Sequence, residues 1–133
     1  MHSSEYCFWN GHKIQLIGQW HIKWYNVDLE NSAKFRLNYI KDSNRVKALA
    51  YSAMDSSWVS EIDASDVLFI IEGLSMYLSE EDNKRILDII DGNFKSCTVF
   101  TEIMPPVSVK NVKEKSVEEM DAKFIWGGGS KGK

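Results

Sequence analysis

The sequence predicts a layered α/β fold with a mainly parallel sheet. Stretches rich in β-branched and aromatic residues alternate with stretches whose apolar residues recur at helical spacing. The run at 67–71 is apolar without a break, which is typical of a strand covered by helices on both faces. The 133 residues suffice for one domain of ordinary size and are too few for two comfortable ones.

Four strands and the helices between them can be placed along the chain. The first strand is expected over 21–27, with Ile22 and Trp24 on one face and Tyr25 and Val27 on the other. A helix over about 32–40 follows, then a second strand over 46–51 and a short helix over about 57–62. Either Ser56 or Asp55 is suited to begin that short helix.

The second half of the chain holds the clearest signals. A strand over 67–72 precedes a helix over 79–91, in which Ser79 is a good N-cap and Gly92 is placed to end the helix. A strand over 97–103 is stopped by two prolines, and apolar residues from 108 to 124 recur near helical spacing. We therefore expect a domain over 21–126 and a flexible glycine-rich tail over 127–133. Residues 1–20 give only a vague signal, with one candidate strand at 13–17.

Composition excludes several classes of function. Sixteen Lys and Arg against nineteen Asp and Glu give a net charge of -3, so the chain has no basic footprint for nucleic acid or an anionic membrane. Its two cysteines and three histidines form no zinc-like spacing, and free thiols are expected. No apolar run approaches the ~20 residues of a membrane span, and no leader pattern is seen. We therefore expect a cytoplasmic protein without a metal site.

Two acidic residues end predicted strands. Ligands of parallel α/β sheets bind beyond the carboxyl ends of the strands, where Asp28 and Glu72 fall. A carboxylate there can accept hydrogen bonds from both hydroxyls of a ribose. The alternative for Asp28 is an N-cap of the following helix, and the alternative for Glu72 is a structural ion pair.

A third candidate segment follows the strand over 46–51. Small residues at 52–53 would let a ligand ring approach the backbone, and Asp55 could accept a hydrogen bond from an exocyclic amine. The alternative is that Asp55 only caps the short helix.

Three blocks, in this order, resemble the leucine carboxyl methyltransferase family. The blocks are Trp24-Tyr25-Asn26-Val27-Asp28-Leu29-Glu30, Ser52-Ala53-Met54-Asp55-Ser56-Ser57-Trp58 and Ile71-Glu72-Gly73-Leu74-Ser75-Met76-Tyr77-Leu78. Within that family, the blocks resemble those of bacterial O-methyltransferases of the kind that act in tetracenomycin polyketide synthesis. The resemblance covers about 24–105, with a weaker continuation at 124–127.

The resemblance implies a Rossmann-like domain that binds S-adenosylmethionine and transfers its methyl group to a carboxylate or hydroxyl oxygen. It implies that Asp28 binds the ribose and that Ala53, Met54 and Asp55 run along the adenine. Glu72 matches an acid near the methionine end of the cofactor. The acceptor would be a small molecule or a protein, and the resemblance identifies no catalytic residue. Tyr77 matches a motif tyrosine whose expected job is core packing.

The chain also departs from the family pattern. No glycine-rich turn with an acid precedes Trp24, since Gly18 stands alone, and no closing strands follow Trp126. We therefore expect a fold that is incomplete at both ends, as in a shortened or internally deleted relative. Bare sheet edges would invite pairing with a second copy, so a homodimer is a hypothesis. A catalytically inactive α/β domain that acts in binding or self-association remains the alternative to an enzyme.

Overall fold

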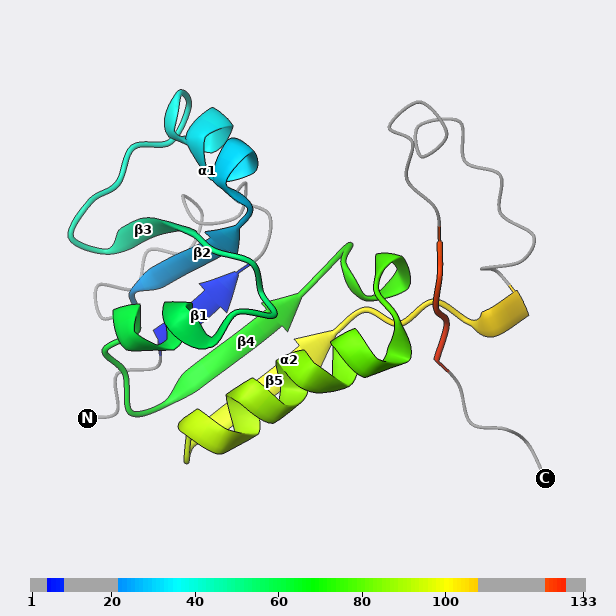
Figure 1. Ribbon diagram of the computed structural model, residues 1–133. Coiled ribbons are helices and arrows are strands. Elements are labelled where there is room, and N and C mark those ends of the chain that lie inside the picture. Colours follow the sequence, from blue (N-terminus) through cyan, green and yellow to red (C-terminus); the bar gives the residue numbers. More distant parts are fainter. Residues whose placement is uncertain (1–4, 9–21, 108–123, 129–133) are drawn as a thin grey trace.

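The computed structural model describes residues 5–8, 22–107 and 124–128 of the chain (Figure 1). The elements in chain order are β1 (Glu5–Phe8), β2 (Trp24–Asp28), α1 (Glu30–Leu37), β3 (Val46–Ala50), η2 (Ser56–Glu61), β4 (Val67–Ile71), η3 (Ser75–Tyr77), α2 (Glu80–Asn93) and β5 (Cys97–Thr101). Here η denotes a 3₁₀ helix. The candidate strand at 13–17, nearly all of the helix expected over 108–124, and most of the expected tail lie outside the described residues.

The five strands form one sheet in the order β3-β2-β1-β4-β5, and every neighbouring pair is parallel. The predicted parallel α/β fold is therefore confirmed. The central strand β1 lies before residue 21, where the one candidate strand was expected at 13–17, and it pairs with both β2 and β4. β1 thus joins the two halves of the described sheet at its centre.

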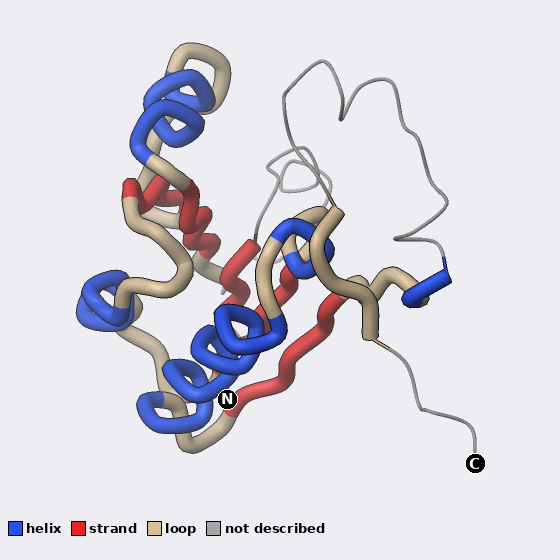
Figure 2. Tube along the Cα trace, turned by 45° about the vertical axis from the view of Figure 1, so that its right-hand side comes forward, coloured by secondary structure: helices blue, strands red, loops and turns tan. Residues whose placement is uncertain are grey.

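The main core lies on one face of the sheet, beneath η2 and α2, which run along the same side of the strands in Figure 2. An aromatic group forms its centre: Trp58 stacks on Phe94 with ring centroids 6.1 Å apart, and Phe69 meets Phe94 edge-on at 5.0 Å. Tyr25 and Val27 belong to this core, whereas Ile22 and Trp24 form a separate cluster. The predicted division of β2 into two faces is confirmed.

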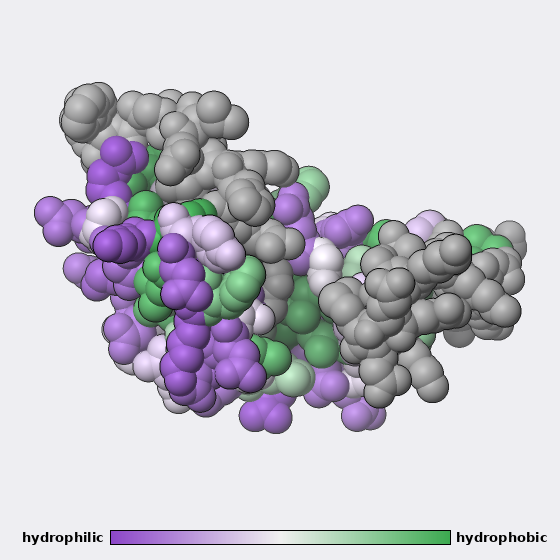
Figure 3. Space-filling model, turned by 90° about the horizontal axis from the view of Figure 1, so that it is seen from above, coloured by the Kyte–Doolittle hydropathy of each residue, from purple (hydrophilic) through white to green (hydrophobic). Residues whose placement is uncertain are grey.

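The two α-helices differ in how the sequence specifies them. In α2, the Ser79 hydroxyl accepts a hydrogen bond from the Asp82 N–H at 3.0 Å, as the predicted N-cap requires. The expected end at Gly92 is wrong, because α2 continues to Asn93 and delivers buried Phe94 to the core. In α1 only Ala33 is buried. The exposed apolar side chains of this region are Leu29, Phe35, Leu37 and Tyr39. The face of the molecule seen from above mixes hydrophobic and hydrophilic surface (Figure 3).

Residues 124–128 lie against η3. The N–H groups of Ile125 and Trp126 both donate to the Met76 carbonyl, at 2.6 and 3.2 Å. A Cβ on Gly128 would lie 2.7 Å from Ile103 and 2.8 Å from the Trp126 ring, so a larger residue there would force one of these side chains to move. Gly128, which falls in the expected flexible tail, is therefore packed against these two side chains. Of the helices in the described residues, none is long and apolar enough to cross a membrane.

Candidate functional site

The sheet order reverses at β1, since the chain moves outward to β2 and β3 on one side and to β4 and β5 on the other. Such a switch point leaves a crevice at the carboxyl ends of the strands. Cys7 pairs with Tyr25 on one side and with Phe69 on the other, and Asp28 and Glu72 each lie three residues beyond those partners. The two acids therefore flank the end of β1 at the same height, two strand spacings or roughly 10 Å apart.

Asp28 is the last residue of β2 and is half-buried. Its Oδ1 accepts a hydrogen bond from the Leu29 N–H at 2.7 Å, and the Ser32 hydroxyl also binds the carboxylate. Burial raises the pKa of the Asp28 carboxyl above its usual value, although both of these hydrogen bonds oppose the rise. The alternative prediction, that Asp28 is the N-cap of α1, is wrong: Leu29 holds that position without a side-chain cap.

The turn after β3 packs against the main core and is hydrogen-bonded to it. The buried Trp58 donates its Nε1–H to the Ala53 carbonyl at 3.1 Å, and Ala53 and Met54 are half-buried against the core. Asp55 is exposed and is the N-cap of η2, so the predicted capping role is confirmed. Its Oδ1 accepts from the Ser57 N–H at 2.9 Å and the Ser57 hydroxyl at 2.7 Å, and these bonds lower its pKa.

Glu72 follows β4 directly and is half-buried. Gly73, the next residue, has a φ of +64°, which turns the chain sharply at the carboxyl edge. Its N–H donates to Glu102 Oε2 at 3.2 Å. Glu102 directly follows β5 and was not among the predicted site residues. The same signal that selected Asp28 and Glu72, an acid at the end of a strand, would have found it.

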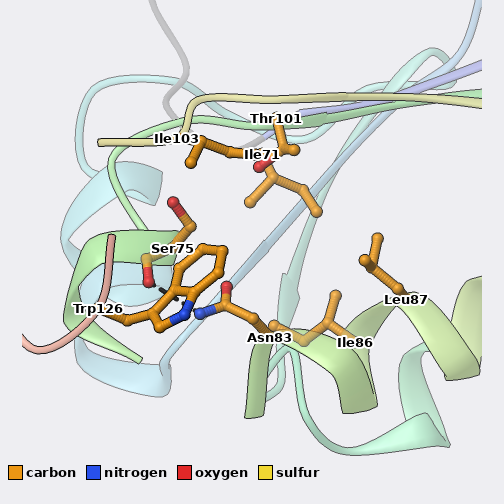
Figure 4. A pocket seen from close by; sticks show the side chains of 8 residues that line it. All are labelled: Ile71, Ser75, Asn83, Ile86, Leu87, Thr101, Ile103 and Trp126. Carbon is orange, nitrogen blue, oxygen red and sulfur yellow. Dashed lines mark hydrogen bonds between the residues drawn. The ribbon is translucent and has the colours of Figure 1, made fainter. Parts of the chain in front are cut away.

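A recess opens beside this turn, between the ends of β4 and β5 and the first half of α2 (Figure 4). Trp126 forms one wall, and Asn83 holds the floor by donating to the Ser75 and Ser79 carbonyls, both at 2.9 Å. Tyr77 points elsewhere, with its ring 5.3 Å from that of Phe124. Its expected packing role agrees with this contact.

The sheet therefore brings all five predicted site residues to one edge. Asp28 and Glu72 lie on either side of the central strand β1. Ala53, Met54 and Asp55 follow β3, which pairs with β2. Within the described part of the chain, no group of three or more His, Cys, Asp and Glu side chains is arranged to hold a metal ion.

One of the comparisons with known proteins finds a similar fold. No family model and no curated protein matches the sequence. Among solved structures, the chain is similar to an O-methyltransferase family protein from Burkholderia thailandensis, with a TM-score of 0.57 and 11% sequence identity. The match covers 93% of this chain and 42% of that protein. This protein therefore has a fold like that of an O-methyltransferase family member and spans less than half of its length.

Proposed function

We propose that the chain is an S-adenosylmethionine-binding O-methyltransferase domain, related to the leucine carboxyl methyltransferase family. The observation that carries the proposal is Asp28, a half-buried carboxylate at the end of β2, next to the central strand of a parallel sheet. The resemblance of three sequence blocks and the fold of the Burkholderia neighbour both support it.

The residues at the crevice fit the chemistry of this cofactor. A carboxylate offers about four acceptor positions. Leu29 and Ser32 use part of that capacity at Asp28, so two ribose hydroxyls can still be bound. Partial burial strengthens such hydrogen bonds because water competes less. Ala53 and Met54 offer a half-buried, apolar surface for the adenine ring.

Each acid has a separate role in the proposal. Asp28 binds the ribose, and Glu72, level with it across β1, binds at the methionine end of the cofactor. When bound, the cofactor supplies a sulfonium leaving group, so this chain contributes chiefly by holding the acceptor oxygen in line. A carboxylate acceptor is already ionised near neutral pH and needs no general base. The proposal therefore assigns binding residues and no catalytic base.

Thermal unfolding of the full chain with S-adenosylhomocysteine tests the proposal. A ligand at 100 times its dissociation constant stabilises the folded state by about 2.7 kcal/mol, so the melting temperature should rise by several degrees. ATP serves as the control, because it shares the adenosine and lacks the amino-acid portion. Glu72→Gln should reduce the shift, whereas Glu81→Gln, an exposed acid in the first turn of α2, should not. A folded sample without any shift at millimolar ligand would leave the non-catalytic α/β domain as the remaining reading.

A further inference from the structure

The two outer strands of the sheet present different free edges. On β3, the outward N–H of Ala48 donates to Asp42 Oδ1 at 2.9 Å, and that of Val46 donates to the Ser43 hydroxyl at 3.2 Å. The exposed Lys47 adds a charge to this strand. Side-chain caps and lysines are the devices by which proteins prevent another strand from pairing with an edge. These outward N–H groups of β3 are therefore not available to pair with another strand.

Within the described residues, the β5 edge carries no such protection. Among the described residues, β5 pairs with β4 alone. Its sequence, Cys97-Thr98-Val99-Phe100-Thr101, contains no charge, no proline and no glycine, and it favours strands. Large apolar side chains are exposed on β5 and close to its end, namely Phe100, Leu87 and Ile103. An edge of this kind is suited to pairing with another strand.

The hydrogen-bond pattern fixes which backbone groups face outward. Val67 donates its N–H to the Ser96 carbonyl, and Glu102 donates its N–H to the Ile71 carbonyl. Because backbone groups alternate along a strand, even-numbered residues of β5 bond to β4 and odd-numbered residues point to the free edge. The outward groups therefore belong to Cys97, Val99 and Thr101.

We propose that the β5 edge is a self-association surface, on which β5 of a second copy of this chain pairs antiparallel. With Val99 opposite its own counterpart, Cys97 lies opposite Thr101 of the second copy. All three outward residues then sit in hydrogen-bonded pairs, two bonds each and about six in all. The arrangement is two-fold symmetric, as closed homodimers usually are.

The charges at the ends of the strand favour a second copy in this orientation. The exposed Lys95 lies two residues before β5, and the exposed Glu102 directly follows it. Antiparallel pairing sets the lysine end of one copy beside the glutamate end of the other, whereas parallel pairing would bring like ends together. The five paired positions themselves oppose no like charges. A contact of one short strand is small, so we expect a dissociation constant on the order of 10–100 μM.

Sedimentation velocity of the full chain across that concentration range tests the proposal. The wild type should shift from monomer to dimer. Phe100→Lys should weaken the dimer at least about tenfold, since it places like charges within about 7–8 Å of each other across the pair. Phe35→Lys on α1 is the matched control, because Phe35 is 64% exposed and Phe100 is 59% exposed. A wild type that stays monomeric throughout, or equal effects of the two substitutions, would overturn the proposal.

Disulfide trapping gives a second readout, which does not depend on the folding of Phe100→Lys. In the proposed register, Thr98 faces Phe100 of the second copy at a Cα separation of about 4.5 Å, within the range of a disulfide. Thr98→Cys and Phe100→Cys chains, each without Cys7 and Cys97, should therefore cross-link when mixed. Each chain alone should cross-link much less, because the like residues lie on a diagonal. Thr98→Cys alone that cross-links as efficiently as the mixture would indicate an antiparallel register shifted by two residues, with Thr98 opposite its own counterpart, and would contradict the proposed register.

Discussion

The turns after β2 and β3 each present an aspartate at the same edge of the sheet. Folding shifts the pKa values of the two carboxylates in opposite directions. Asp55 is exposed, caps η2 and has a lowered pKa, because the Ser57 hydroxyl and N–H stabilise its charge. Asp28 is half-buried, caps nothing and has a raised pKa, because burial disfavours its charge. The charge of Asp55 therefore stabilises the folded state, and the charge of Asp28 does not. A carboxylate that folding does not favour is a candidate for ligand binding.

Of the substitutions considered, removal of the Trp58 side chain, which supports the turn after β3, should change the free energy of unfolding most. Trp58→Ala deletes a buried ring and its bond to Ala53, so the free energy of unfolding should fall by about 3–5 kcal/mol in urea denaturation. Trp58→Phe keeps most of the packing and loses the hydrogen bond, so it should cost nearer ~1 kcal/mol and serves as the folded control. Amide exchange in Trp58→Phe should quicken at 52–56 and stay unchanged at 28–32. Equal acceleration of both turns would show that they are not held separately.

Asp55→Ala should lower the melting temperature at pH 7 because η2 loses its cap. Since the pKa of folded Asp55 lies below the ordinary 3.8, the stability that its charge contributes is present above that value and is lost as the pH falls through the lowered pKa. The difference between the wild type and Asp55→Ala should therefore narrow in strong acid. Thermal unfolding from pH 7 to pH 2.5 measures it, and a difference that is constant or grows in acid would contradict the prediction.

Asp28→Asn should have the smallest effect on stability and the opposite sign. Because folding raises the pKa of Asp28, the wild type loses stability as the pH rises through that raised value. Asparagine carries no charge, so the variant should be more stable than the wild type at pH 7, by less than about 1 kcal/mol given the solvent screening of a half-exposed group. The two curves should meet below pH 3.8. A variant less stable than the wild type at neutral pH would assign Asp28 a structural role.

Features with local signals were predictable from the sequence, and features made by distant pairing were not. Ser79 and Asp55 start their helices because the capping bond spans two or three residues. The four residues of β1 carry little signal of their own and become a strand by pairing with β2 and β4. The bond between Gly73 and Glu102 joins residues 29 positions apart, which no local pattern encodes. The placement of Asp28 and Glu72 at one edge followed from the parallel fold alone.

Calorimetric titration with S-adenosylhomocysteine tests the central claim most directly. The wild type should bind with a dissociation constant of about 10 μM, which corresponds to a binding free energy of about 7 kcal/mol. Asp28→Asn should lose at least about tenfold in affinity while staying folded, since it removes charge-assisted hydrogen bonds to the ribose. Asp55→Ala should lose much less, because that carboxylate is engaged by Ser57. Binding that is unchanged in Asp28→Asn, or absent from the folded wild type, would contradict a cofactor site at the end of β2.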